Sequence, residues 1–278
     1  MDGWGHTAFR WLGIAGIELS GQGVVIAIDP FFSRPPFRRE WLGRVLPYRP
    51  LVAAKVPRCD YILVSHSHWD YLVDVPEVVR ATGALAMASA RGSRLLSILG
   101  APEERVQQIQ AGDTLLLGGF RIQVLAARHR PPHEDRRLPG LLPREPLPQL
   151  PPAVGHTDAD FSFLIEAGEL RLLHWNGDDP EPAVPADLLF LGPQRNQEQY
   201  GALLRRVRPK VVIPVRWDEM VRPPIAPSSI RLARSSWSLS ALHAAGLSSF
   251  EKAIRRVAPT ARVFLPDPFQ SYRLDQML

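Results

Sequence analysis

The sequence contains a single cysteine, Cys59, among its 278 residues. One cysteine excludes an intramolecular disulfide and a cysteine-rich metal site, so any metal ion must be bound by histidine and carboxylate side chains. The N-terminal segment lacks the basic start and the apolar stretch of a signal peptide. We therefore expect a cytoplasmic protein, in which the thiol stays reduced.

Long apolar runs and lysine are also scarce. No segment approaches the roughly 20 apolar residues that a membrane-spanning helix needs, so no transmembrane segment is predicted. Only three of the 33 basic residues are lysines, and the arginines are spread along the chain. Nucleic-acid binding requires basic residues clustered on one face, so we predict no nucleic-acid partner. The net charge of +5 permits an anionic small-molecule substrate; the oligomeric state is not indicated.

The composition, with 45% apolar and 22% charged residues, is typical of a globular protein, and we predict one domain over residues 1–278. Two proline-rich segments interrupt it, at about 34–57 and 130–152. Proline removes a backbone donor and blocks helix continuation. Each segment directly follows a candidate site residue, so we expect two long surface loops that cover a site.

Short apolar runs that end in polar residues predict strands, and apolar residues at helical spacing predict helices. Near-continuous apolar strands indicate a sheet buried on both faces. Hairpins followed by strand–helix units predict an α/β protein with two mixed sheets packed together and helices outside. The predicted strands are 23–28, 61–64, 120–126, 170–173, 188–191 and 211–215, the hairpins pair 108–117 with 120–125 and 161–165 with 170–173, and the helices are 75–81, 92–99, 197–207 and 238–257.

The segment 59–72 places His66, His68 and Asp70 directly after an apolar run. A metal ion that activates water needs histidine nitrogens or carboxylate oxygens that converge from several backbone segments. Two imidazoles and a carboxylate within five residues, at a strand-to-loop turn, therefore indicate a metal site.

Two further ligands are expected from other strand ends. His129 follows the predicted strand 120–126, and His133 in the same loop is the alternative. Asp178 is the expected anionic ligand because Gly177 before it gives the backbone freedom to turn the carboxylate inward, and Asp179 is the alternative.

The order of these motifs resembles the metallo-β-lactamase fold superfamily. Further segments narrow the resemblance to the branch that contains ascorbate-6-phosphate lactonases and the phospholipase D that cleaves N-acyl-phosphatidylethanolamines. The resemblance implies an αββα sandwich with its site at the sheet edges. It is carried by Asp29, His66-x-His68-x-Asp70, His129, Gly177-Asp178 and Arg216, and is narrowed by Trp11-Leu12-Gly13, Ile28-Asp29-Pro30-Phe31 and Val64-Ser65-His66.

The resemblance also implies two metal ions. The first would be bound at the positions of His66, His68 and His129, with Asp178 bridging to the second. The second would be bound by Asp70, by the histidine after it, by a histidine on the last motif strand and by the bridging aspartate.

Two residues differ from the ligands that the resemblance implies for the second metal ion. Tyr71 replaces the histidine after Asp70, and Arg216 stands where the histidine of the last motif is expected. Tyrosine is a poor zinc ligand at neutral pH, with an unperturbed pKa near ~10, although it binds iron in some proteins. Arginine stays protonated and cannot coordinate a metal ion. Ile14 also occupies a position at which relatives often have a histidine.

These residues predict a hydrolase with one divalent metal ion. The guanidinium of Arg216 would replace the second cation and pair with Asp70 and Asp178. Zinc is the expected metal, with manganese or iron as alternatives. The substrate would be a small ester, lactone, amide or phosphodiester, with Asp70 as general base and Arg216 stabilising the developing negative charge. Tyr71 would be a proton donor or a packed aromatic residue. The alternative hypothesis is a catalytically inactive or repurposed binding or accessory protein of the same fold.

Overall fold

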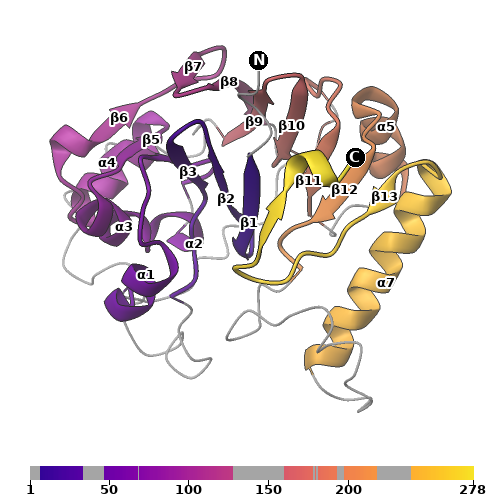
Figure 1. Cartoon of the computed structure of the whole chain (residues 1–278), viewed down its shortest axis with the longest axis horizontal. Coiled ribbons are helices and arrows are strands. Elements are labelled where there is room, and N and C mark those ends of the chain that lie inside the picture. The colour runs from indigo at the N-terminus through magenta and orange to yellow at the C-terminus, as the bar shows by residue number, and fades with distance from the viewer. Residues whose placement is uncertain are drawn as a thin grey trace, which may run out of the picture.

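The computed structural model describes residues 7–33, 47–67, 69–127, 160–177, 179, 181–192, 197–217 and 239–278. Its strands form two seven-stranded sheets with the orders β14-β1-β2-β3-β4-β5-β6 and β13-β12-β11-β10-β9-β8-β7. The sheets face each other in the middle of the molecule, and helices cover the outside of each (Figure 1). The predicted α/β fold, an αββα sandwich of two mixed sheets, is confirmed.

The first sheet is antiparallel from β14 through β3 and parallel from β3 to β6. Its strands are β1 Ala8–Gly13, β2 Gly16–Gly21, β3 Val24–Ile28, β4 Tyr61–Leu63, β5 Leu85–Ala88, β6 Val106–Gln108 and β14 Ser271–Arg273. The helices of this half are α1 Arg49–Lys55, α2 Trp69–Leu72, α3 Val75–Thr82, α4 Ala90–Ile98 and the 3-10 turn η1 Glu103–Arg105.

The second sheet is antiparallel from β7 to β10 and parallel from β10 to β13. Its strands are β7 Thr114–Leu117, β8 Phe120–Ala127, β9 Asp160–Ala167, β10 Leu170–Trp175, β11 Leu188–Leu191, β12 Val211–Pro214 and β13 Arg262–Val263, and its helices are α5 Gln197–Val207, α7 Leu239–Val257 and the 3-10 turn η3 Leu274–Gln276. Among the described residues, no helix is both long and apolar enough to cross a membrane.

Strand β11 shows why the strands of the second sheet are continuous apolar runs in the sequence. Successive side chains of a strand point to opposite faces of its sheet. Leu188 and Phe190 belong to the cluster between the two sheets, whereas Leu189 and Leu191 belong to the cluster beneath α5 and α7. Both faces of the strand are therefore buried, and no polar residue alternates with the apolar ones.

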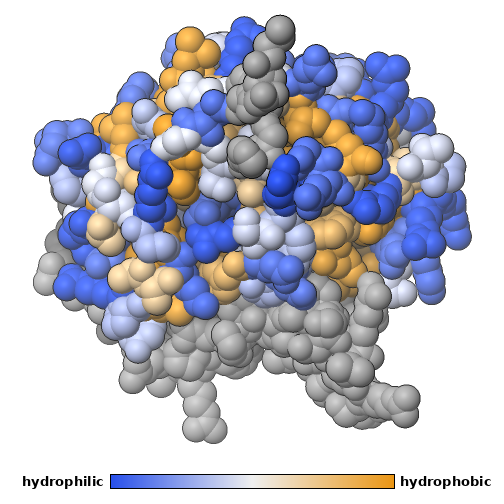
Figure 2. Space-filling model, viewed as in Figure 1, coloured by the Kyte–Doolittle hydropathy of each residue, from blue (hydrophilic) through white to orange (hydrophobic). Residues whose placement is uncertain are grey.

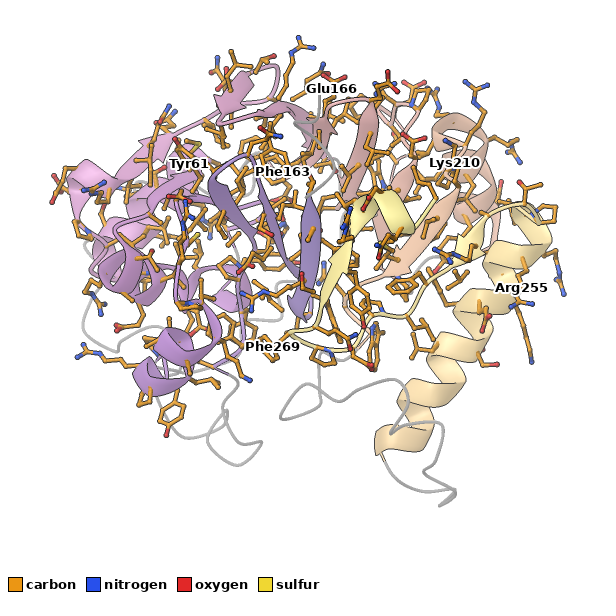
Figure 3. The ribbon with its side chains drawn as sticks, in the orientation of Figure 1. Tyr61, Phe163, Glu166, Lys210, Arg255 and Phe269 are labelled. Carbon is orange, nitrogen blue, oxygen red and sulfur yellow. The ribbon has the colours of Figure 1, made fainter. Side chains whose placement is uncertain are left out.

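Phe163 of β9 is fully buried between the sheets, where the side chains of both inner faces meet (Figure 3). A second cluster fills the space between the first sheet and helices α3 and α4. On the face shown in Figure 2 the right-hand edge, over α5 and α7, is largely hydrophilic. The outer helices thus bury one side and expose the other, as amphipathic helices do.

The prediction of one loop over 34–57 is wrong for its last part, which contains helix α1. Pro50 lies in the first turn of this helix, where the missing N–H costs no hydrogen bond. Val52 and Val56 are fully buried against the first sheet's helical layer. Proline content alone therefore led to the wrong prediction of a loop where helix α1 forms. Residues 34–46 and the loop predicted at 130–152 lie outside the described residues.

The predicted hairpin of 108–117 with 120–125 is confirmed from Thr114 on, where β7 pairs with β8, and is wrong for the residues before it. Strand β6 ends at Gln108 in the first sheet, and β7 begins at Thr114 in the second. Between them, the backbone N–H of Gln110 donates to Asp113 Oδ2 at 2.9 Å, and Gly112 has a φ of 97°. These residues form a turn that carries the chain from one sheet to the other.

Candidate metal centre

The candidate site lies where several strands of both sheets end. His66 follows β4, Tyr71 belongs to α2, and Arg216 follows β12. The backbone of Asp70 is part of α2, and its side chain lies outside the described part of the chain. The predicted ligands that also lie outside it are His68, His129, the alternative His133, and Asp178. Asp179, the alternative to Asp178, accepts a hydrogen bond from the backbone N–H of Glu181 at 3.1 Å, in a turn.

His66 contacts a carboxylate that sequence reasoning missed. Its Nδ1 lies 2.5 Å from Oδ1 of Asp160, and the side chains are 10% and 15% exposed. Asp160 is the first residue of β9 and pairs with Ala127 at the end of β8. Asp160 belongs to no recognisable motif, because it stands at the beginning of an apolar strand far from the histidine motif.

Tyr71 lies beside both His66 and Arg216. Its side chain is 1% exposed, and its ring centroid lies 5.3 Å from that of His66. The guanidinium carbon of Arg216 lies 5.4 Å from the centroid of the same ring. This is a cation–π contact. The two residues that replace the expected histidines therefore contact each other, next to the first histidine of the motif.

Arg216 is held in place through its backbone. Its N–H donates to the carbonyl of Ile14 at 2.7 Å, which ties the end of β12 to the turn between β1 and β2. Arg216 and Ile14 have φ angles of 63° and 46°. A positive φ is uncommon outside glycine and is a real outlier for a β-branched residue, so both positions carry backbone strain. The guanidinium Nη1 also lies 3.5 Å from Oδ1 of Asn176.

A buried hydrogen-bond network supports the backbone before His66. Asp29 accepts from the backbone N–H of Ser65 at 2.7 Å and from its hydroxyl at 2.5 Å. The side-chain amide of Asn176 donates to the Ser65 hydroxyl at 3.2 Å, and the Asn176 N–H donates to Ser162 Oγ at 2.9 Å. Asp29 thus satisfies the backbone donor of the residue next to His66.

His174 is a buried residue with a different environment. Its Nε2 lies 3.0 Å from the carbonyl of Ala15, which indicates that this nitrogen carries the proton and donates. Burial lowers the pKa of His174 to about 4, the hydrogen bond to the Ala15 carbonyl acts in the opposite direction, and the positive charge of Arg216 also lowers the pKa. The ring is therefore neutral near pH 7.

Of the four predicted ligands only His66 is described, and among the described residues no three His, Cys, Asp or Glu side chains form a group that could hold a metal ion. His66 has its Nδ1 against a carboxylate, the arrangement in which the other ring nitrogen is the metal ligand. At the positions that the resemblance implies for the second ion, an arginine cannot coordinate, and the ring of Tyr71 is buried beside Arg216. His66 therefore fits a ligand of the first site, whereas Tyr71 and Arg216 do not suit a second.

The two facing mixed sheets, with helices outside and polar groups at the strand ends, define the metallo-β-lactamase-like fold. The chain belongs to the family described as the Beta-lactamase superfamily domain, which matches residues 8–216.

Curated relatives carry the description UPF0173 metal-dependent hydrolase. One from Anaeromyxobacter dehalogenans is 29% identical over 135 residues, which are 47% of this chain and 46% of that protein. Another from Symbiobacterium thermophilum is 25% identical over 228 residues, 75% of this chain and 83% of that protein. The chain thus spans about half the length of the first of these relatives.

A solved structure with the same fold is the metallo-β-lactamase fold protein YhfI from Bacillus subtilis. It aligns with a TM-score of 0.59 at 11% identity and covers 96% of this chain and 98% of its own. At this identity the likeness concerns the fold alone. The narrower resemblance to the lactonase and phospholipase branch stays a prediction.

Proposed function

We propose that this protein is a metal-dependent hydrolase that uses one divalent ion, with Arg216 in place of a second ion. The ligands would be His66, His68, His129 and Asp178. The observation that carries the proposal is the contact between Arg216 and Tyr71 beside His66, with the guanidinium 5.4 Å from the ring centroid. Zinc is the preferred metal because three histidines and a carboxylate suit it, and manganese or iron are alternatives.

A bound ion would supply Lewis acidity and lower the pKa of water. The chain's own residues would perform the remaining steps. Asp70 would accept the proton of the attacking water as general base. The fixed positive charge of Arg216 would stabilise the negative charge that develops on the substrate. Tyr71 would hold the guanidinium by its ring face and is the candidate for donating a proton to the leaving group.

The proposed substrate is a small ester, lactone, amide or phosphodiester that carries a negative group. Arg216 supports this class because guanidinium groups bind carboxylates and phosphates strongly when partly buried. Its side chain is half-buried, so the ion pair would be only partly screened by water. We place this activity in the cytoplasm, with no nucleic-acid partner.

A binding or accessory role is the second candidate. It is favoured by the same two residues, since Tyr71 and Arg216 remove both imidazoles that the family resemblance implies for the second ion. A protein of this kind would keep the fold and would tolerate the loss of His66.

The test is hydrolysis of a panel of anionic esters, lactones and phosphodiesters by the zinc-loaded protein. We expect Arg216→Ala to lower turnover by about 100-fold, the typical effect of removing one group that stabilises a developing anion. Arg216→Lys should recover part of this loss because it keeps the charge without the planar fork. His66→Ala should remove turnover.

The matched control is Arg121→Ala, which removes an exposed arginine of β8 that pairs with Glu166 at 3.1 Å. This variant should keep wild-type turnover. If wild type is active and Arg216→Ala matches it, the role of Arg216 is wrong. If no panel member is hydrolysed by the loaded protein, the binding or accessory role is favoured.

A further inference from the structure

We propose that Asp160 is a positioning residue for the metal centre. By placing its negative charge against Nδ1 of His66, it would favour the proton on that nitrogen, so that Nε2 is the nitrogen presented to the ion. This inference rests on the proposed function insofar as it takes His66 as a ligand. It assigns a role to a residue that belongs to no motif of the sequence.

The carboxylate of Asp160 lies against one ring nitrogen of His66. Nδ1 of His66 and Oδ1 of Asp160 are 2.5 Å apart, an ion-pair contact. The negative charge of the carboxylate repels a lone pair on the nitrogen that faces it, so it favours the tautomer with the proton on Nδ1. In a neutral imidazole the other nitrogen, Nε2, then carries the lone pair that a metal ion needs. The carboxylate also makes that nitrogen more basic.

Limited exposure strengthens the contact. The side chains of His66 and Asp160 are 10% and 15% exposed, so little water competes for the carboxylate. The ring of Tyr71 covers one side of the imidazole at a centroid distance of 5.3 Å. A charge-assisted contact in such surroundings is stronger than one at the surface.

Both partners are anchored independently of the contact. The backbone N–H of Phe161, next to Asp160, donates to the carbonyl of Ser65 at 2.8 Å. Ser65 is in turn held by two hydrogen bonds to Asp29. The backbone on each side of the contact is thus fixed where strand β9 begins and where β4 has just ended. A ligand supported in this way is preorganised before the ion binds.

His174 shows the opposite arrangement in the same region. There Nε2 is the nitrogen within 3.0 Å of an acceptor, the carbonyl of Ala15, and the ring is enclosed in the core. The acceptor placed beside each ring therefore distinguishes a histidine built to present Nε2 from one built to fill the core.

The experiment compares wild type with Asp160→Ala, Asp160→Asn and the control Glu166→Gln. Glu166 lies near the other end of β9, far along the strand from Asp160 (Figure 3). Its carboxylate pairs with Arg121 and Arg171 at the surface. The control thus removes one carboxylate from the same strand without touching the site.

The first readout is zinc affinity, measured by competition with a chromophoric chelator. Asp160→Ala should bind zinc about 10- to 100-fold more weakly, the usual effect of removing a group that orients a ligand. The zinc affinity of Asp160→Asn should lie between those of wild type and Asp160→Ala, because the amide oxygen can still accept a hydrogen bond but carries no negative charge. Glu166→Gln should match wild type.

The second readout is the tautomer of His66 in metal-free protein, from long-range ¹⁵N–¹H spectra of histidine-labelled samples, with His66→Gln to assign the signal. Wild type should show a protonated Nδ1, and Asp160→Ala should shift the proton toward Nε2. A thermal melt checks folding, and Asp160→Ser replaces the alanine variant if that variant does not fold.

The two readouts separate the inference from the proposed function. Wild-type affinity together with an unchanged tautomer in the alanine or serine variant would overturn the role of Asp160. A wild-type chain that binds no zinc would overturn the proposed function and the effect on metal affinity. The tautomer in metal-free protein would then still decide whether Asp160 orients His66.

Discussion

Tyr71 contacts two side chains with different chemistry, the imidazole of His66 and the guanidinium of Arg216. A cation over an aromatic ring contributes about 0.5–2 kcal/mol, more when water is excluded. Tyr71 therefore links the two side chains at the candidate site, and replacing either Tyr71 or Arg216 would remove the same cation–π contact.

His174 makes the stability of the protein depend on pH. Its pKa is about 4 in the folded chain, where burial disfavours the charged ring, against an ordinary value of 6.5. Between these values the unfolded chain binds more protons, so the free energy of unfolding rises with pH. The contribution is fully present above about pH 6.5 and is lost as the pH falls toward 4. Between pH 6.5 and 5 it amounts to about 2 kcal/mol.

The measurement is urea unfolding at pH 7.5 and pH 5 for wild type and His174→Gln. The glutamine amide can still donate to the Ala15 carbonyl but does not titrate. We expect the variant to lose about 2 kcal/mol less than wild type over this interval. An equal loss in both proteins would show that His174 does not titrate as described.

Most elements were predictable because their signals are local. The strands of the second sheet are nearly continuous apolar runs, and helix α5 matches its predicted bounds, Gln197–Val207. Helix α1 was missed because five prolines crowd the segment that contains it, although proline is harmless in a first turn. Residues 108–117 were predicted as one strand, although they contain a turn between the two sheets. Such a turn is distinguished from a continuous strand by tertiary contacts, which leave no local signal in the sequence.

The site was predictable only as far as its motif extends. His66 was found by its spacing to His68 and Asp70. Asp160, Asn176 and Ser162 were missed, because each is a single polar residue at the end of, or within, an apolar strand. Asp160 and Asn176 meet His66 and Ser65 only when the two sheets pack together, and Ser162 accepts a hydrogen bond from the backbone N–H of Asn176.

Asp74 connects two elements of the first half of the chain. It is fully buried at the N-terminus of α3, and its Oδ2 accepts from the backbone N–H groups of Phe32 and Ser33, both at 2.7 Å. Asp74→Ala would leave two buried donors without this acceptor. We expect the free energy of unfolding to fall by about 2–4 kcal/mol.

Chemical denaturation of the variants at pH 7.5 measures this effect. Asp74→Asn should cost less, because an amide oxygen still accepts. The matched control is Glu77→Gln in the same helix, which removes ion pairs with Arg49 and Arg80 and should cost less than about 1 kcal/mol. Similar losses for Asp74→Ala and Glu77→Gln would contradict this interpretation of Asp74.

At the scale of the whole molecule, the candidate site is shared between the two halves of the sandwich (Figure 1). The first sheet and its helices supply Asp29, His66 and Tyr71, and the second sheet supplies Asp160 and Arg216. The apolar cluster between the sheets therefore fixes the distances within the site. Neither half contains the site alone.

The central claim is that this arrangement holds one metal ion and excludes a second. The most direct test is elemental analysis of metal per chain after incubation with excess zinc and removal of loosely bound ions. We predict about one ion in wild type and none in His66→Ala, since three histidines and a carboxylate form one ligand set. Two tightly bound ions per chain, or none in wild type, would contradict the claim.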